Sequence, residues 1–553
     1  MSVEKLIVDH METWTSALQT RSTAGRGSSG KIDLYGIKKL RELILELAVR
    51  GKLVPQDPND EPASDLLKRI AAEKAELVKQ GKIKKQKPLP EISEEEKPFE
   101  LPEGWEWVHL PDIYCSISES SRKIKSSEIL PEGKYPVIEQ SQEFISGYCN
   151  NECLLIKLNN PVIVFGDHTR NIKFIDFDFV VGADGVKILS PILICERFFF
   201  WQLRSFKLDV RGYARHFKVL NSCLFALPPI AEQERIVEKV SSLMSLCDQL
   251  EQQSLTSLDA HQQLVETLLG TLTDSQNTAE LAENWARISE HFDTLFTTEA
   301  SVDALKQTIL QLAVMDKLVP QDPNDEPASE LLKRIAQEKA QLVKEGKIKK
   351  QKPLPPISDE EKPFELPEGW EWCRIGNIVN IKSELVSPKD YLNLYQVAPD
   401  IIEKGTGRVI SKRTVKESGV KGPNSRFYKG QIVYSKIRPS LSKVFLAEYN
   451  GLCSADMYPL DCYINPNYLL KYILSIPFLM QVKKAENRIK MPKLNSDSFY
   501  NIIVAIPPYN EQQAIFDKIN SIEAVCNGLI SYIGIYHKTQ LHLADALTDA
   551  AIN

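Results

Sequence analysis

The sequence of 553 residues lacks any apolar run that approaches the roughly 20 residues a membrane-spanning helix needs. Its first residues, MSVEKLIVDHMETW, carry acids within the apolar stretch and lack the basic start of a signal peptide. The ten cysteines include no CxxC pair and no histidine-rich segment accompanies them, so neither a zinc site nor a disulfide framework is indicated. We therefore expect a cytoplasmic protein with reduced cysteines and no metal.

The net charge of −6 argues weakly against a nucleic-acid partner, but this average hides local differences. Residues 375–506 contain 19 Lys and Arg against 10 Asp and Glu, a net charge of +9, and residues 110–227 contain 14 against 13. The rest of the chain must therefore carry −16. The length and the ordinary globular composition indicate several folded domains.

A long repeat dominates the sequence. Residues 53–107 and 318–372 agree at 49 of 55 positions, with a constant offset of 265 and no gap. Within each copy an apolar period predicts an amphipathic helix, which in the first copy is capped by Ser64 and ends at Gly81. A strap rich in Lys, Glu and Pro follows, and it ends in LPEGWEW.

A second repeat relates LPPIAEQERIVEKV at Leu227–Val240 to IPPYNEQQAIFDKI at Ile506–Ile519. Proline followed by glutamate predicts a helix start. Beyond it, a shared 4-3-4-3 spacing predicts two equivalent coiled-coil seams that face each other, although two unrelated amphipathic core helices are the alternative. The seam residues are Ile236, Val240, Leu243, Cys247 and Leu250, and then Ile515, Ile519, Ile522, Cys526 and Leu529.

The two halves form a circle, because HMETW at His10 is the counterpart of HFDTL at His291. Between the repeats lie two dissimilar pieces with alternating apolar residues, in which VIVFGDHTRN echoes QIVYSKIRPS. We predict an α+β chain with two mixed domains that contain prominent sheets. The predicted segments are helical region and strap 1–109, domain 110–227, helical region and strap 228–374, domain 375–506, and helix 507–553.

This ordered set of motifs resembles the specificity subunit of type I restriction-modification systems, in the branch with long repeats. The resemblance implies two target recognition domains, each of which reads half of a split DNA target, separated by long antiparallel coiled-coil helices in a pseudo-two-fold circle. It also implies two modification subunits docked on the repeats, and restriction subunits. S-adenosylmethionine, ATP and Mg would belong to those partners, and this chain would have neither catalysis nor a cofactor.

Arginine can bind guanine O6 and N7 through two hydrogen bonds, and asparagine can bind adenine in the same way. Basic clusters beside the exit helices fit phosphate contacts, with an ordinary solvated basic face as the alternative for any single residue. The candidate DNA-binding residues of the first domain are His168, Thr169, Arg170, Asn171, Arg211, Arg215 and Lys218, with His216 in the same cluster. Those of the second domain are Lys436, Arg438, Lys443, Lys483, Lys484, Arg488, Lys490 and Lys493.

Three other motifs have plain interpretations. GRGSSG at Gly25–Gly30 has no preceding strand and no helix directly after it, so it indicates a linker rather than a phosphate loop. IPPY starting at Ile506 lacks the polar first residue of the amino-methyltransferase motif, which favours helix initiation. The tryptophans of LPEGWEW either anchor a partner or pack on their own domain, and we favour packing. A subunit serving modification only, and a methyltransferase in its own right, remain the alternative functions.

Overall fold

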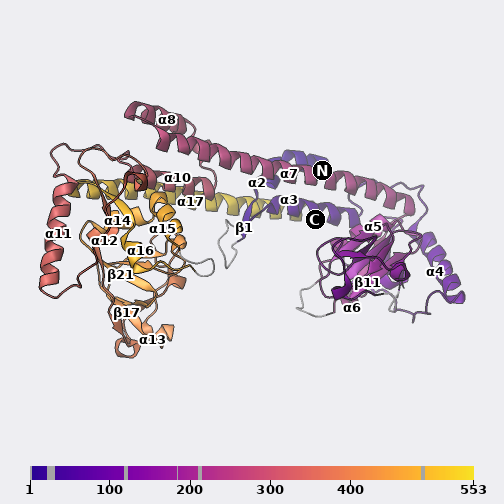
Figure 1. Ribbon diagram of the computed structural model, residues 1–553. Helices are drawn as coiled ribbons and strands as arrows, with labels where there is room; N and C mark the ends of the chain where they lie inside the picture. Colours follow the sequence, from indigo (N-terminus) through magenta and orange to yellow (C-terminus); the bar gives the residue numbers. More distant parts are fainter. Residues whose placement is uncertain are drawn as a thin grey trace. The chain divides into compact units, whose positions relative to one another are not determined.

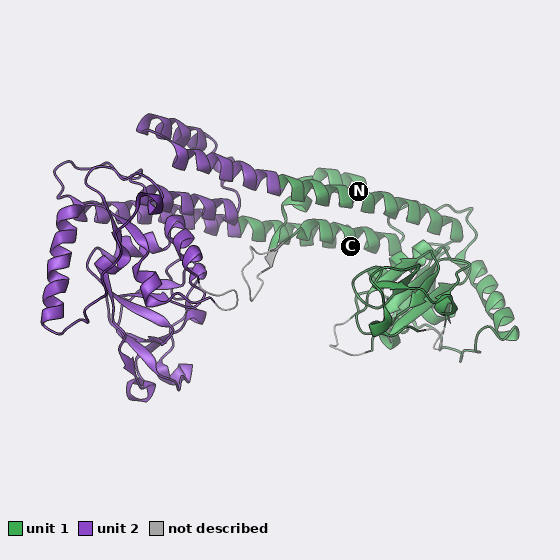
Figure 2. Ribbon diagram, in the orientation of Figure 1, with its two compact units in different colours: residues 1–257, 535–553 green, residues 258–534 purple. Residues whose placement is uncertain are grey.

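The computed structural model describes residues 3–21, 31–117, 123–182, 185–208, 215–486 and 492–552. The chain forms two compact units (Figure 2): unit 1 contains Met1–Ser257 and Ile535–Asn553, and unit 2 contains Leu258–Gly534. Each unit holds one sheet-rich domain and a set of helices. The linker motif Gly25–Gly30 lies outside the described residues.

The sheet domain of unit 1 begins and ends at one antiparallel strand pair, β3 (Glu106–His109) with β12 (Leu224–Leu227). Between them lie two four-stranded sheets. The first has the order β4 (Tyr114–Ile117), β11 (Val186–Pro191), β8 (Val162–Gly166), β9 (Ile172–Ile175), and the second β6 (Gly147–Cys149), β5 (Tyr135–Ile138), β10 (Phe179–Val181), β7 (Leu155–Ile156). Helix α5 (Glu196–Ser205) packs between the first sheet and helix α3 (Tyr35–Val49) (Figure 1), and the short α6 (Phe217–Leu220) precedes β12.

The sheet domain of unit 2 repeats this design with a different sequence. It is closed by β13 (Glu371–Arg374) and β22 (Ile503–Ile506). Its first sheet has the order β14 (Val379–Ile381), β21 (Met457–Cys462), β18 (Ile432–Ser435), β19 (Val444–Leu446), and its second β15 (Leu385–Val386), β17 (Asn424–Phe427), β20 (Gly451–Ser454), β16 (Tyr395–Val397). The helices of this domain are α12 (Ile375–Ile378), α13 (Val415–Ser418), α14 (Pro466–Ile473), α15 (Ile476–Ala485) and α16 (Ser496–Tyr500). In each domain the second sheet contains one parallel pair, β5 with β10 and β16 with β20, among antiparallel neighbours.

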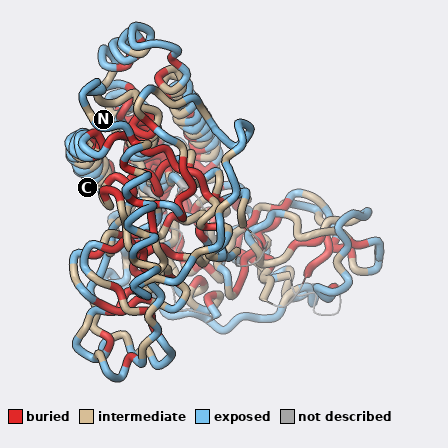
Figure 3. The backbone as a smooth tube through the Cα atoms, turned by 60° about the vertical axis from the view of Figure 1, so that its left-hand side comes forward, coloured by how far each residue is buried: buried red, intermediate tan, exposed pale blue. Residues whose placement is uncertain are grey.

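The cores of the domains follow from the apolar runs. All five residues of β8 and all four of β18 are buried, because these strands have packed side chains on both faces. Figure 3 shows the buried backbone in red inside a paler, exposed outline.

Two long helices, α7 (Ile230–Asp274) and α17 (Tyr509–Ile552), start at the predicted proline motifs. Ile506 of IPPY ends β22 and is fully buried, which confirms the helix-initiation interpretation. Unit 1 also contains α1 (Val3–Asp9), α2 (Met11–Ser16), α3 and α4 (Ala63–Lys79), with the strand pair β1 (Gln19–Arg21) and β2 (Lys31–Asp33). Unit 2 contains α8 (Thr278–Glu290), α9 (Phe292–Leu295), α10 (Glu299–Val314) and α11 (Ala328–Lys344).

The seam residues lie on α7 and α17 and are buried or half-buried, but their packing partners differ from the prediction. Ile522, Cys526 and Leu529 pack in one cluster with α10 and with the second half of α7, all within unit 2. In unit 1, Arg41 of α3 reaches Asp248 and Glu251, both at 2.6 Å, beside the first seam. The two seams therefore pack within their own units, and the predicted mutual pairing is wrong. An apolar period marks a buried face but does not say what covers it.

The predicted circular order of the two halves is seen in equivalent hydrogen bonds at the ends of α7 and α17. In unit 2, Lys317 donates to the carbonyl oxygens of Thr273 and Ser275 at the end of α7, both at 2.8 Å. In unit 1 its counterpart Lys52 donates to the carbonyl oxygen of Ile552 at the end of α17, at 2.6 Å. The end of α17 is thus held as the end of α7 is held, as the alignment requires.

The repeated motifs bond to one another inside each unit. Trp105 Nε1 donates to Glu232 at 2.9 Å, and Trp370 Nε1 donates to Glu511 at 3.1 Å. Both tryptophans are buried, so they pack on their own chain, as favoured. The helix of the first repeat ends as predicted, with Gly81 at φ 69°, but its N-cap is Pro62 rather than Ser64, which lies in the first turn.

The glutamine beside each of these glutamates is fully buried. Gln233 accepts from the amide of Cys195 at 3.0 Å and donates to Pro228 O at 2.9 Å. Gln512 makes the same two bonds with Asn465 N and Pro507 O, at 2.9 and 3.0 Å. The Glu-Gln pair therefore fastens each long helix to the sheet domain beside it, which explains why it occurs twice.

Among the described residues, no helix is long and apolar enough to span a membrane. The described residues also contain no cluster of His, Cys, Asp and Glu arranged to hold a metal ion. All ten cysteines fall within the described ranges, and each is a free thiol.

Candidate nucleic-acid interface

The GDHTRN motif of unit 1 forms the turn between β8 and β9. The amide of Gly166 donates to Asn171 O, and the amide of Arg170 donates to Gly166 O, both at 2.8 Å. The Thr169 hydroxyl and the Asn171 side chain both donate to Gln140 O, the latter at 2.9 Å. A Cβ on Gly166 would lie 2.3 Å from Thr169 Oγ1, so the close fold of this turn requires glycine there.

The SKIRPSLSK motif of unit 2 forms the corresponding turn between β18 and β19. Lys436 Nζ donates to Ala455 O at 2.8 Å and lies 3.8 Å from the carboxylate of Asp456. Lys443 Nζ donates to Pro399 O, and burial lowers the pKa of Lys443. The amide of Arg438 donates to Pro492 O at 2.9 Å.

Arg170 and Arg438 occupy equivalent places with the same unusual backbone. Their φ angles are 62° and 46°, in the left-handed region that costs a residue with a side chain about 1 kcal/mol or more. Such strain persists only where the surroundings fix the backbone, and it is concentrated at functional sites. The two sheet domains thus present an arginine from the same strained position, although their sequences differ almost everywhere around it.

Each turn is bonded to the segment that precedes the exit from its domain. In unit 1 the amide of His216 donates to Asp167 O at 2.8 Å, and Arg170 Nη1 donates to Leu208 O at 2.8 Å. In unit 2 the amide of Leu494 donates to Lys436 O at 2.9 Å. The turn is therefore hydrogen-bonded to the exit segment in each domain.

The predicted basic residues of the two exit segments, apart from His216, divide into two groups. Arg215, Lys218, Lys483, Lys484 and Lys493 are exposed, and Lys493 lies 3.4 Å from Asp456, the acid that also faces Lys436. Arg211, Arg488 and Lys490 lie outside the described residues.

His216 is a correction, because it is 1% exposed and its Nδ1 lies 3.1 Å from Asp167 O. It supports the turn from inside the domain, so the surface contact expected from the basic cluster around it is wrong. The nearby positive charges gave no indication that this ring faces the core.

A hairpin of unit 2 that the sequence did not single out adds two cations next to the turn. Gly405 and Gly407, at φ 70° and 77°, allow a close reversal, and the amide of Gly405 donates to Ser442 O at 3.4 Å. Lys404 and Arg408 on this hairpin are exposed. In the sequence, the Gly-x-Gly spacing flanked by Lys404 and Arg408 is the pattern that could have predicted this basic hairpin.

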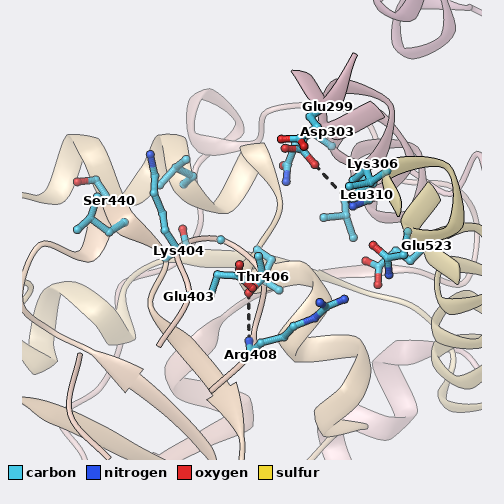
Figure 4. A pocket seen from close by; sticks show the side chains of 18 residues that line it. Glu299, Asp303, Lys306, Leu310, Glu403, Lys404, Thr406, Arg408, Ser440 and Glu523 are labelled. Atoms are coloured by element: carbon cyan, nitrogen blue, oxygen red, sulfur yellow. Dashed lines mark hydrogen bonds and ion pairs between the residues drawn. The ribbon is translucent and has the colours of Figure 1, made fainter. Parts of the chain in front are cut away.

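A cleft of about 530 Å³ lies between this hairpin, the turn, α10 and α17 (Figure 4). Its walls carry charges of both signs. Lys306 lies 3.6 Å from Asp303, and Glu523 pairs with Lys471 at 2.6 Å. This lining of mixed charge does not match a polyanion.

Comparison with known proteins gives these surfaces a family. Residues 102–260 and 367–533 match the family described as type I restriction modification DNA specificity domain. The chain therefore belongs to the family of type I restriction-modification specificity subunits, which confirms the resemblance found in its motifs. It is 51% identical to the specificity subunit of the type I restriction enzyme EcoAI and 48% identical to that of EcoEI, both from Escherichia coli, over the full length of all three chains.

A solved structure of the HsdS subunit from Thermoanaerobacter tengcongensis is 16% identical to this chain, with a TM-score of 0.37, and the match covers 83% of this chain and 98% of that one.

Proposed function

We propose that the two sheet domains, residues 110–227 and 375–506, each read one half of a split double-stranded DNA target through the turn that joins β8 to β9 in unit 1 and β18 to β19 in unit 2. The observation that carries the proposal is the matched pair of strained arginines, Arg170 and Arg438, on sheets of the same topology. The two domains share the same sheet and turn but differ in the side chains around the arginine. This arrangement suits two half-sites of different sequence, because base edges are read by individual side chains.

The remaining parts of the chain fit an assembly. The repeated helical regions would dock two modification subunits, and restriction subunits would complete the complex. S-adenosylmethionine, ATP and Mg would be bound by those partners, and this chain would supply recognition without catalysis. Ten free thiols agree with a cytoplasmic location.

The test uses the full chain assembled with its modification subunits, and duplexes mutated in one half of the target or the other. Arg170→Ala should weaken recognition of one half-site and Arg438→Ala that of the other, each by about 1 to 3 kcal/mol if the contact is to a base edge. Equal, small losses on both halves would reject the assignment.

Two matched controls lie on the repeated helices. Arg69 pairs with Glu61 in unit 1, and Arg334 pairs with Glu326 at 2.7 Å in unit 2. Arg69→Ala and Arg334→Ala remove the same charge away from the turns and should leave both half-sites unaffected. Incubation of the isolated chain with labelled S-adenosylmethionine and DNA tests the alternative function, because methyl transfer without a partner would show that this chain is itself an enzyme.

A further inference from the structure

The helix of each long repeat ends in a lysine-rich reversal. Helices α4 and α11 stop at Gly81 and Gly346, whose φ angles are 69° and 70°. The next amides, of Lys82 and Lys347, donate back to Leu77 O at 3.0 Å and Leu342 O at 2.9 Å, and so close the last turn of each helix. The following residues, 82–87 and 347–352, both read KIKKQK, and we name them the lysine turns.

Both lysine turns are held in shape by the same contacts. Gln86 accepts from Lys74 Nζ at 3.1 Å, and Lys74 also donates to Pro111 O at 2.6 Å, at the start of the sheet domain. In unit 2, Lys339 donates to Gln351 at 3.5 Å and to Gly376 O at 2.6 Å. Each lysine turn is therefore fixed to the sheet domain of its own unit, which also carries the turn with Arg170 or Arg438.

The other lysines of these turns point into solvent. The exposed ones are Lys82, Lys84, Lys85 and Lys87, and Lys347, Lys349, Lys350 and Lys352. Within the described part of the chain, the four of unit 1 have no carboxylate within ion-pair distance, whereas in unit 2 Lys347 pairs with Glu345 at 2.8 Å and Lys352 lies 3.6 Å from Asp497. No acidic residue interrupts KIKKQKPLP in either copy, although the chain outside the two sheet domains is strongly acidic.

We propose that the lysine turns bind the phosphate backbone of the DNA, one turn beside each half-site, without reading its sequence. The inference rests on the proposed function and extends it to the repeated part of the chain. A sequence-independent partner explains why these residues are identical although the two sheet domains differ, because the phosphate backbone is the same beside any half-site.

The composition of the lysine turns favours DNA over a protein partner. Protein interfaces are poor in lysine and rich in aromatic residues and arginine, and KIKKQK has neither of those. Lysine serves well as a point charge for phosphate. Each neutralised phosphate releases counterions. The logarithm of the affinity therefore falls by about 0.9 per contact for each tenfold rise in salt concentration.

The experiment measures affinity against salt concentration for the full chain with its modification subunits, on a duplex with the target and on one without it. The variants are Lys84→Gln/Lys85→Gln/Lys87→Gln, the equivalent triple change in unit 2, and both together. Each triple change should make the slope of log K against log salt shallower by about 1 to 3 on both duplexes. Three lost contacts would reduce the affinity change between 50 and 200 mM salt by roughly 40-fold.

The matched control is Lys68→Gln/Lys333→Gln. These lysines are exposed on the same two helices but pair with Asp65 and Glu330, both at 2.7 Å. Where mass measurement shows that the control complex has assembled, its slope should be unchanged. An unchanged slope in the triple variants, or a loss of subunit assembly seen by mass measurement, would overturn the proposal. If the unaltered complex fails to distinguish the two duplexes, the proposed function is wrong, but the slope on either duplex still decides the role of the lysine turns.

Discussion

Unit 2 contains a pair of carboxyl groups, those of the buried Glu511 and the half-buried Asp316, that unit 1 lacks. Asp316 stands where Gly51 stands in the first half, and their φ angles are 57° and 67°. The carboxyl of Asp316 hydrogen-bonds that of Glu511, whereas Glu232, the counterpart of Glu511, receives a hydrogen bond from Gln56 at 3.2 Å. One carboxyl must keep its proton for such a bond, and burial together with Asp316 raises the pKa of Glu511 to about 8.

This pair makes the stability of unit 2 depend on pH in a defined direction. In the unfolded chain Glu511 has its ordinary pKa of 4.5, so folding keeps a proton that unfolding releases. The free energy of unfolding should therefore fall as the pH rises from about 4.5 to about 8, by up to roughly 1.4 kcal/mol per pH unit. Asp325 adds to the effect, because its charge also raises the pKa of Glu511.

The change Asp316→Gly restores the residue of the first half. It should stabilise unit 2 by about 1 kcal/mol at pH 5, because glycine adopts the left-handed backbone without strain. At pH 8 the gain should be larger, since the second carboxyl no longer faces Glu511. Asp316→Asn separates the two causes, because it removes the charge but not the strain. The reverse change, Gly51→Asp, should destabilise unit 1, where a Cβ would lie 2.3 Å from Pro102 Cγ.

Amide hydrogen exchange at pH 5 and pH 8, corrected for the intrinsic rate, measures this locally. The peptide of residues 506–519 reports on Glu511. The equivalent peptide of residues 227–240 is the comparison in the same molecule, because burial also raises the pKa of Glu232 there but no counterpart of Asp316 adds to it. If Asp316→Gly gains equal protection at both pH values, the carboxyl pair does not control the pH dependence. If it loses protection at both, the strain argument fails as well.

Two further outcomes follow from the repeated scaffold. Gln233→Ala and Gln512→Ala should each destabilise their own unit by about 2 to 4 kcal/mol, because two buried backbone groups lose their partners in each case, and denaturation followed by exchange of the adjacent helix start would check this. The fragment Met1–Thr298 should form a two-fold dimer, measured by sedimentation, in which Val265 takes the place of the fully buried Ala544. Relief of that overpacking by Val265→Ala should tighten the dimer by about 1 to 3 kcal/mol, and a fragment that stays monomeric with either residue would contradict the equivalence of the halves.

Much of the candidate site could be predicted because its chemistry is local. An arginine and an asparagine in a polar turn after a buried strand give the same hypothesis whatever surrounds them, and the structure places that turn between β8 and β9. His216 could not be assigned in this way, because its burial depends on the neighbouring turn that packs over it. Lys404 and Arg408 were missed for a related reason, since only the fold brings their hairpin next to Ser442.

The sequence by itself determined the two repeats, their circular order, the two dissimilar domains and the starts of both long helices, because repeats and helix signals depend on neighbours along the chain. The tertiary structure decided what covers each buried face. It placed the seam residue Cys526 beside α10 rather than beside the other seam, and it joined Trp105 to Glu232 and Trp370 to Glu511. It also placed the carboxyl of Asp316 against that of Glu511. The change from Gly51 to Asp316 between the two halves therefore raises the pKa of a buried group. An apolar period shows which face of a helix is buried. The element that packs on that face is set by the shape and charge of segments that are distant in the sequence.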